Sequence, residues 1–304
     1  MRRLHYHLVD VFTDRAFGGN PLAVVTNGRG VTDETMQAVA KEFNLSETTF
    51  VLPPDDPQHD WRVRIFTPAH ELPMAGHPTV GTAFVLAREH LIPRGERETN
   101  IIFEEGVGPV PVRIEFENGE PVFAEMRQPL PTFGPRLDDR KAIAAMLSLE
   151  ESDLELDLPV EIVSCGVPFL YVPLRSLDAA HRARPHADLI ERAAHEHGIP
   201  PEVFVFTREV ESDFATVHSR MFAPGLGINE DPATGAASGP LGCYLVRYGL
   251  VAGDPAAEIV SEQGLEMGRP SYIRIRIERQ GEEFNAVRVG GQCHFMGEGF
   301  IEIG

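Results

Sequence analysis

The chain contains two copies of one short sequence pattern, and this repeat constrains its fold more than any other feature. In the first copy, RIFTP at residues 64–68 leads through a short loop to HPTVGTA at residues 77–83. In the second copy, RMFAP at residues 220–224 leads to DPATGAA at residues 231–237. A pattern that recurs in this order indicates a duplicated unit, so we expect two structurally similar halves.

Each copy ends in a polar residue and a proline that open a run of small and apolar residues. This arrangement predicts a helix start, with His77 or Asp231 as the capping residue and the proline at the first helical position. Helix N-termini bind anions, because their free N–H groups and the helix dipole favour negative charge. If the two copies face each other, their two helix starts would hold a small carboxylate.

The rest of the chain reads as a mixed, strand-dominated α+β fold. An amphipathic helix is expected at residues 32–44, and two more at 138–147 and 187–197. The two repeat helices lack a charged face, which predicts that other structure encloses them. We therefore expect two similar halves, each a curved, barrel-like sheet around a central helix, with the active site in the cleft between them.

The proline-rich segment at residues 128–135 interrupts both periodicities and is expected to be the linker between two domains. These domains would span residues 1–127 and 128–304, and the last strand of the second could pack back on the first.

Composition narrows the possible partners and location. The formal net charge is −19, which argues against nucleic acid and anionic membranes as partners. Because an apolar run long enough to span a bilayer is missing and the N-terminus lacks an apolar signal core, we expect a cytoplasmic protein. The three cysteines are scattered and odd in number, so a disulfide framework is not indicated.

Several cofactor and metal patterns are incomplete. The segment GLGINE at residues 225–230 lacks the third glycine of a dinucleotide loop. His5 and His7 share a strand face and could begin a metal site, but the sequence places no further ligand at suitable spacing. We therefore predict neither a metal centre nor a cofactor.

Three residues could carry chemistry. Glu47 follows the first helix and begins a segment of apolar and β-branched residues, where lost solvation would raise the pKa of its carboxyl. A solvated glutamate at a strand end is the alternative. Asp231 is a favoured N-cap, so it has a structural as well as a functional interpretation. His77 is a poor N-cap, which favours a chemical role, and a positive helix end would favour its neutral form.

Six ordered motifs resemble the PhzF family of phenazine-biosynthesis-like proteins, and the resemblance runs nearly end to end. They are DVFT with GNPLAV in residues 10–24, NLSET at 44–48, AGHPTVGTA at 75–83, GVPF at 166–169, EDPATG at 230–235 and EQGLEMGRPS at 262–271.

The resemblance implies a diaminopimelate-epimerase-like fold and cofactor-independent isomerisation, in which a glutamate moves a proton on a small carboxylic acid. It also implies a homodimer. Carried over to this chain, it gives Glu47 as the acid/base, His77 and Asp231 as further catalytic residues, and four substrate-binding positions: Ser46, Gly76, Gly235 and Ala236.

Two departures of this chain from the pattern of related enzymes leave alternative functions open. The phenazine enzyme has a serine at the position of Ala236, so a hydroxyl that assists binding or proton relay is missing here. Epimerases of the same fold place a cysteine at each helix start, where this chain has His77 and Asp231. The leading hypothesis is an isomerase that uses Glu47, and the alternatives are a catalytically impaired ligand-binding protein and an epimerase with two carboxylate bases. The substrate and its pathway do not follow from the sequence.

Overall fold

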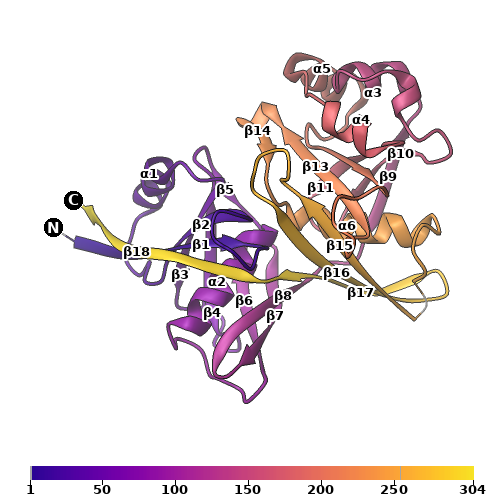
Figure 1. Cartoon of the computed structure of the whole chain (residues 1–304). Coiled ribbons are helices and arrows are strands. Elements are labelled where there is room, and N and C mark those ends of the chain that lie inside the picture. Colours follow the sequence, from indigo (N-terminus) through magenta and orange to yellow (C-terminus); the bar gives the residue numbers. More distant parts are fainter. Residues whose placement is uncertain (1, 254) are drawn as a thin grey trace. The chain divides into compact units, whose positions relative to one another are not determined.

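The computed structural model describes residues 2–253 and 255–304, which form two compact units (Figure 1). Unit 1 comprises Met1–Arg127 and Val289–Gly304, and unit 2 comprises Gln128–Arg288. The chain passes from unit 1 to unit 2 within strand β8 and returns within strand β17.

Unit 1 is a sheet wrapped around helix α2 (Gly76–Arg88), with helix α1 (Asp33–Phe43) inserted between two of its strands. Its strands are β1 (Arg2–Val11), β2 (Asn20–Val25), β3 (Glu47–Leu52), β4 (Trp61–Phe66), β5 (Glu71–Leu72), β6 (Glu98–Glu105), β7 (Gly108–Glu117), β8 (Glu120–Gln128) and β18 (Cys293–Ile303). Strand β1 lies between β2 and β18 and is antiparallel to both, so the two ends of the chain are adjacent (Figure 1).

Unit 2 is built in the same way around helix α6 (Gly235–Arg247). Its strands are β9 (Thr132–Leu137), β10 (Val160–Ser164), β11 (Pro168–Pro173), β12 (Val203–Thr207), β13 (Val217–Ala223), β14 (Ile228–Asp231), β15 (Ala256–Gln263), β16 (Ser271–Gln280) and β17 (Glu283–Gly291). Its other helices are α3 (Arg140–Met146), α4 (Leu177–Arg182) and α5 (Ala187–His197), with 3₁₀ turns at Glu151–Asp153 and Pro224–Leu226. Helices α3, α4 and α5 gather at one end of this unit over an apolar cluster (Figure 1).

The strand pairings confirm the duplication that the sequence repeat predicts. In unit 1, β2 is parallel to β3, β3 is antiparallel to β4, β4 is parallel to β6, and β6 is antiparallel to β7. In unit 2, β11, β12, β13, β15 and β16 follow the same sequence of parallel and antiparallel pairings. The repeat therefore covers whole sheets and not only the two short motifs that reveal it.

The two central helices are enclosed, as their lack of a charged face predicts. Residues 76–87 of α2 and 235–246 of α6 are all buried. Glycine lets each helix approach its sheet: a Cβ on Gly81 would lie 2.6 Å from Val11 Cγ2, and one on Gly242 would lie 2.6 Å from Ile275 Cγ2. Each helix therefore packs too closely on its sheet to leave room for a side chain at these two glycines.

Helix α1 shows why the amphipathic segment at residues 32–44 folds as predicted. The Thr32 side chain accepts a hydrogen bond from the Thr35 amide, which caps the N-terminus. Asn44 ends the helix in the left-handed conformation that asparagine tolerates. Because Glu47 begins strand β3 only three residues after this cap, the end of α1 helps to determine where Glu47 lies.

The expected linker at residues 128–135 is wrong. Gln128 still belongs to β8, and Thr132–Leu137 forms strand β9, which pairs with β10. The pairing register shifts between Glu161 and Val163, opposite the Gly-Pro step of β9. A proline can occupy a strand at such an irregularity, because there its missing N–H breaks no ladder hydrogen bond.

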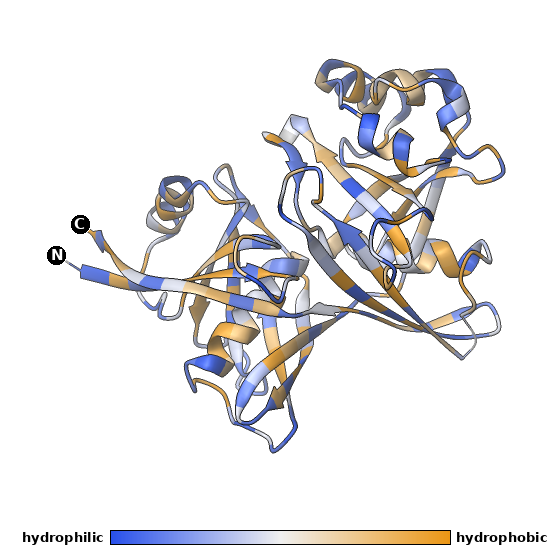
Figure 2. Ribbon diagram, in the orientation of Figure 1, coloured by the Kyte–Doolittle hydropathy of each residue, from blue (hydrophilic) through white to orange (hydrophobic). Residues whose placement is uncertain are grey.

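Four further strands have weak signals in the sequence: β5, β8, β14 and β15. Hydropathy along the strands is mixed (Figure 2), and β8 and β15 each have charged residues at several positions. Alternation that is broken in this way gives a weak strand signal. Within residues 2–253 and 255–304, none of the helices is long and apolar enough to cross a membrane.

Candidate active site

The structure brings Glu47 and His77 together in unit 1. Glu47 is the first residue of β3, and His77 is the second residue of α2. Glu47 Oε2 lies 3.2 Å from His77 Nε2, and the side chains are 12% and 4% exposed. The pair is close without the alignment of a full hydrogen bond, which leaves His77 Nε2 without a well-oriented acceptor.

Asn20 determines how His77 presents its ring. Asn20 Nδ2, at the start of β2, lies 3.2 Å from His77 Nδ1 in a buried contact. An amide NH₂ can only donate, so we infer that Nδ1 accepts and that the ring proton of neutral His77 is on Nε2. Burial lowers the pKa of His77 to about 3, which keeps the ring neutral at physiological pH. The Nε2–H of the neutral imidazole therefore lies close to the Glu47 carboxylate, although it is not aligned for a hydrogen bond.

The predicted cap geometry is wrong for both helix starts. Helix α2 begins at Gly76 with Ala75 as its N-cap, so His77 lies inside the first turn. Helix α6 begins at Gly235 with Thr234 as its N-cap, so Asp231 precedes the helix as the last residue of β14. His77 and Asp231 occupy matching positions in the two motifs, but their local structures differ. Helix α2 starts one residue before His77, whereas helix α6 starts four residues after Asp231. The neutral form of His77 was predicted correctly, although burial is the cause that the structure supports.

A buried carboxyl supports the first turn of α2. Thr79 Oγ1 lies 2.7 Å from the carbonyl oxygen of Ala75 and 2.6 Å from Glu105 Oε1. The Thr79 hydroxyl has one proton and the carbonyl has none, so both contacts can be hydrogen bonds only if Glu105 supplies the second proton. Burial raises the pKa of Glu105 to about 8, and the Thr79 contact opposes this only in part. Glu105 is therefore a neutral acid at pH 7.

In unit 2, Asp231 lies in its own buried network. The Thr234 hydroxyl donates to Asp231 Oδ2 at 2.5 Å. Gln263 Nε2 donates to the Asp231 carbonyl oxygen at 2.8 Å, and Gln263 Oε1 accepts from the Thr234 amide at 3.1 Å. Gln263 ends β15 and fixes the segment between β14 and α6, which is the region that the second motif occupies.

The four positions implied as substrate-binding lie at the starts of these elements. Ser46 immediately precedes β3, Gly76 opens α2, and Gly235 and Ala236 open α6. Gly76, Gly235 and Ala236 are buried, and Ser46 is partly buried. Gln128 Nε2 donates to the Gly235 carbonyl oxygen at 2.9 Å and anchors the first residue of α6.

Sequence reasoning did not single out Asn20, Thr79, Glu105 or Gln263. Asn20 and Gln263 lie within motifs that carry the family resemblance, which was the available signal for them. Glu105 gives no such signal, because a glutamate near the end of a polar strand resembles a solvated one. Its burial depends on tertiary packing, in which Thr79 of helix α2 contacts its carboxyl.

Two groups of side chains in the described residues have metal-ligand spacing: His5, His7 and Glu298 in unit 1, and His181, His218 and Glu266 in unit 2. His218 contacts Glu262 at 3.0 Å and Glu266 at 2.9 Å. Burial alone would lower the pKa of His218, but these hydrogen bonds raise it to about 9. His218 is therefore a cation that already balances the surrounding carboxylates.

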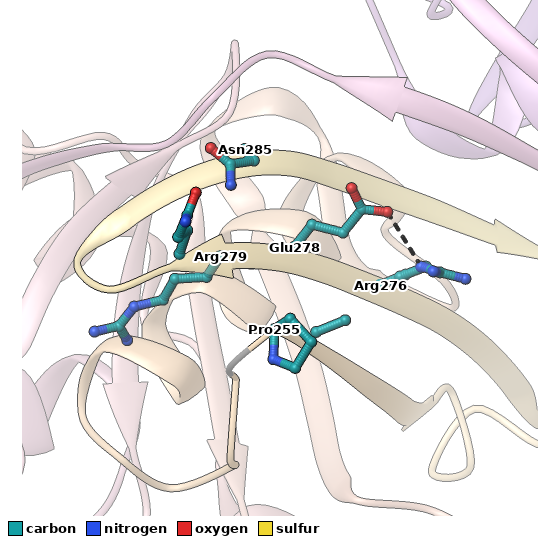
Figure 3. A pocket seen from close by; sticks show the side chains of 7 residues that line it. Pro255, Arg276, Glu278, Arg279 and Asn285 are labelled. Atoms are coloured by element: carbon teal, nitrogen blue, oxygen red, sulfur yellow. Dashed lines mark ion pairs between the residues drawn. The ribbon is translucent and has the colours of Figure 1, made fainter.

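Unit 2 also has an open surface pocket of about 450 Å³ next to strands β16 and β17 (Figure 3). It is lined by Pro255, Ala256, Arg276, Glu278, Arg279, Gln280 and Asn285, and Arg276 pairs with Glu278 at 3.4 Å. None of the predicted site residues lines it, and an ion pair of exposed groups contributes little binding energy. We assign it no part in the site.

Comparison with known proteins identifies the family of the chain. The family profile described as phenazine biosynthesis-like protein, PhzC-PhzF, matches residues 9–299. An uncharacterized isomerase of Mesorhizobium japonicum is 38% identical over 313 residues, covering all of both chains. The trans-2,3-dihydro-3-hydroxyanthranilate isomerase of Pseudomonas aeruginosa is 36% identical, covering 97% of this chain and 98% of that protein.

Solved structures confirm the fold. The Bacillus anthracis phenazine biosynthesis protein of the PhzF family superposes with a TM-score of 0.90 at 29% identity, covering 100% of both chains. A hydroxyproline epimerase from Agrobacterium vitis, at 15% identity and a TM-score of 0.68, shares the fold over 99% of this chain and 92% of its own. The chain belongs to the phenazine biosynthesis-like PhzC-PhzF family and is an isomerase of that family.

Proposed function

We propose that this isomerase shifts a proton within a small carboxylate-bearing substrate, without a cofactor, and that Glu47 alone carries the proton. The observation that supports this most directly is the 3.2 Å approach of Glu47 Oε2 to the Nε2 of a neutral, buried histidine. A carboxylate held next to a neutral hydrogen-bond donor can accept a proton and return it. A cationic histidine in that position would hold Glu47 in its ionised form.

The reaction divides into two proton transfers. Glu47 takes a proton from a carbon of the substrate, and the electrons of that C–H bond shift an adjacent double bond. Glu47 then returns the proton to a different carbon of the same molecule, so that neither atoms nor electrons are gained or lost. His77 Nε2–H would hydrogen-bond first to the carboxylate of Glu47 and then to the charge that develops on the substrate.

The remaining predicted residues would bind and orient the substrate. The backbone N–H groups at Gly76 and Gly235 open two helices, where a substrate carboxylate is favoured by the helix dipoles. Asp231 would orient a polar group of the substrate. It is itself oriented by Thr234.

The relatives suggest which compound to test first. One of them is named as an isomerase of trans-2,3-dihydro-3-hydroxyanthranilate, a small carboxylic acid. In this chain the hydroxyl that the phenazine enzyme places at position 236 is replaced by the methyl group of Ala236, which favours a related substrate over the same one. The family resemblance further supports a cytoplasmic homodimer, and light scattering of the purified protein tests its dimeric state.

Proton exchange in heavy water tests the proposal. The purified protein is incubated in D₂O with this compound and with related unsaturated or amino-bearing acids, and deuterium in the recovered acid is measured by mass spectrometry. We expect Glu47→Gln to lower deuterium incorporation by about 10²- to 10⁴-fold, the usual contribution of general acid–base catalysis. Glu42→Gln, an exposed substitution on α1, is the matched control and should keep full activity. Full incorporation by Glu47→Gln would refute the assignment.

The missing hydroxyl at Ala236 also favours a second function, that of a ligand-binding protein. Such a protein would be stabilised against unfolding by a carboxylic acid without exchanging any of its hydrogens. Stabilisation by ligand together with undetectable exchange would favour this alternative, whereas exchange with inversion of a stereocentre would favour an epimerase.

A further inference from the structure

We infer that unit 1 contains a binding site for a divalent transition-metal ion of the Zn²⁺ type, formed by His5, His7 and Glu298 at the C-terminal end of helix α2. The ligand atoms of these three residues all lie within 4.8 Å of one another. The site is separate from Glu47 and His77 in its residues, and it does not depend on the proposed reaction.

The strand pairing explains why these side chains meet. His5 and His7 are two residues apart on β1, so they point to the same face of the sheet. His7 is directly opposite Glu298 in the antiparallel pairing of β1 with β18. The sequence alone showed only the His-x-His pair, because Glu298 is supplied by the last strand of the chain.

The distances suit a tetrahedral ion. His5 Nε2 lies 3.0 Å from Glu298 Oε2, and His7 Nδ1 lies 3.7 Å from the same oxygen. Ligands at about 2.0 to 2.1 Å from Zn²⁺ in a tetrahedron are about 3.3 Å apart, between these two distances. These two separations are therefore within a few tenths of an ångström of those around a tetrahedral ion.

His7 supplies an independent indication. Its side chain is fully buried, and neither ring nitrogen has a hydrogen-bond partner among the described residues. Buried polar groups are almost always paired, so an unpaired ring that faces two carboxylates requires an explanation. A cation bound at Nδ1 would supply a partner for that nitrogen.

The surrounding charges also favour a cation. Glu89, the C-cap of α2, places Oε1 3.7 Å from His7 Nδ1 and adds a second carboxylate next to this ring. Free carbonyls give the C-terminus of a helix a partial negative charge, which adds to that of the two carboxylates. The nearby cation Arg88 stacks on Phe295 at 4.1 Å. His5 and Glu298 are partly exposed, so an ion could enter from solvent.

Such an ion would connect β1, β18 and the end of α2, three segments from distant parts of the sequence. Its expected role is to stabilise unit 1. Because binding to the folded state raises stability by mass action, Zn²⁺ should raise the midpoint of thermal unfolding by a few degrees.

Titration of tag-free, EDTA-treated protein with Co²⁺ and Zn²⁺ at neutral pH tests the site. Co²⁺ reports coordination through its visible absorption, and displacement by Zn²⁺ gives affinity and stoichiometry. We expect one ion per chain, and at least a tenfold loss of affinity in His5→Gln and in Glu298→Gln. Both residues are partly exposed, so these variants should fold even if a substitution of buried His7 does not.

His181→Gln, in the second histidine group, is the matched control and should bind the ion normally. Unchanged binding in His5→Gln and Glu298→Gln would overturn the inference, as would loss of binding in His181→Gln. Failure of the wild-type protein to bind either ion would overturn it as well.

Discussion

The amide nitrogen of Asn20 lies 3.2 Å from Nδ1 of His77, and this contact decides which ring nitrogen carries the proton that faces Glu47. Asn20 is a positioning residue, because it acts through the tautomer of His77. In many enzymes a hydrogen-bond partner on one ring nitrogen of a catalytic histidine fixes the orientation and protonation of the other nitrogen in this way.

Asn20→Asp should reverse this tautomer. A carboxylate at position 20 would accept a hydrogen bond from Nδ1–H, so neutral His77 would present the Nε2 lone pair to Glu47 in place of an N–H. We expect kcat for deuterium exchange to fall by about 10²-fold, the usual effect of removing one preorganised donor. The ¹⁵N chemical shifts of labelled His77 report the tautomer directly. Asn27→Asp, in an exposed turn, is the control, and an unchanged kcat together with a reversed tautomer would contradict the prediction.

Glu105 should make the stability of unit 1 depend on pH. Its pKa is about 8 in the folded protein against an ordinary 4.5, so its contribution to stability is complete below pH 4.5 and is lost as the pH rises to 8. Relative to Glu105→Gln, which mimics the neutral acid, the wild-type protein should lose up to about 1.4 kcal/mol per pH unit in this window. Fluorescence of Trp61, the single tryptophan, follows unfolding of unit 1, because β4 pairs with β6 at this residue.

The adjacent Glu104 provides the control of opposite sign. Hydrogen bonds from the Asp56 backbone and from His59 lower the pKa of Glu104, so its contribution to stability is present above pH 4.5 and is lost only in acid. Glu104→Gln should therefore lack the loss between pH 4.5 and 8 that is attributed to Glu105. If the difference between wild type and Glu105→Gln were constant from pH 5 to 8, Glu105 would be ionised in the folded protein throughout.

Gly81→Ala should destabilise unit 1 although alanine is the better helix former. The new Cβ would lie 2.6 Å from Val11 Cγ2 and 2.7 Å from Leu22 Cδ2, within a helix that is buried on all sides. Overpacking of this kind costs about 1 to 3 kcal/mol, which exceeds the gain of about 1 kcal/mol from helix propensity. Guanidinium unfolding followed at Trp61 measures the effect. Gly297→Ala, where the Cβ meets nothing within 4 Å, should change stability little, and equal effects of the two would refute the packing argument.

The fold could be predicted largely from the sequence because duplication and apolar helices leave strong local signals. The enclosure of α2 and α6 follows from residues that carry no charge, and helix α1 from its apolar period and its Thr32 cap. Strand β9 could not be predicted in this way. The prolines of residues 128–135 suggest a linker, and only the irregular pairing with β10 explains how Pro135 fits into a strand.

The candidate site can likewise be predicted from the sequence only in part. Glu47 and His77 are recognisable from residue type and motif, and the structure places them in contact. The proton on His77 Nε2 depends on the contact of Nδ1 with Asn20, and the neutral carboxyl of Glu105 depends on the contact with Thr79. Contacts of this kind are set by tertiary packing, so a pattern along one chain does not show them. The start of α6 beyond Asp231 is a further example, because Gln263 from β15 holds that turn.

Asp231→Asn tests whether the second motif serves the same reaction as Glu47. The amide oxygen can still accept from the Thr234 hydroxyl, so the local structure should persist while the negative charge is lost. We expect exchange to fall by about 10²-fold, whereas Asp213→Asn, an exposed substitution in unit 2, should leave it unchanged.

The double variant with Glu47→Gln is the decisive measurement. If both residues act on one proton transfer, its exchange rate should match that of the slower single variant, because groups that act as a unit are not additive. If the two losses multiplied, Asp231 would act independently of Glu47, and inversion of a stereocentre that needs both carboxylates would indicate an epimerase.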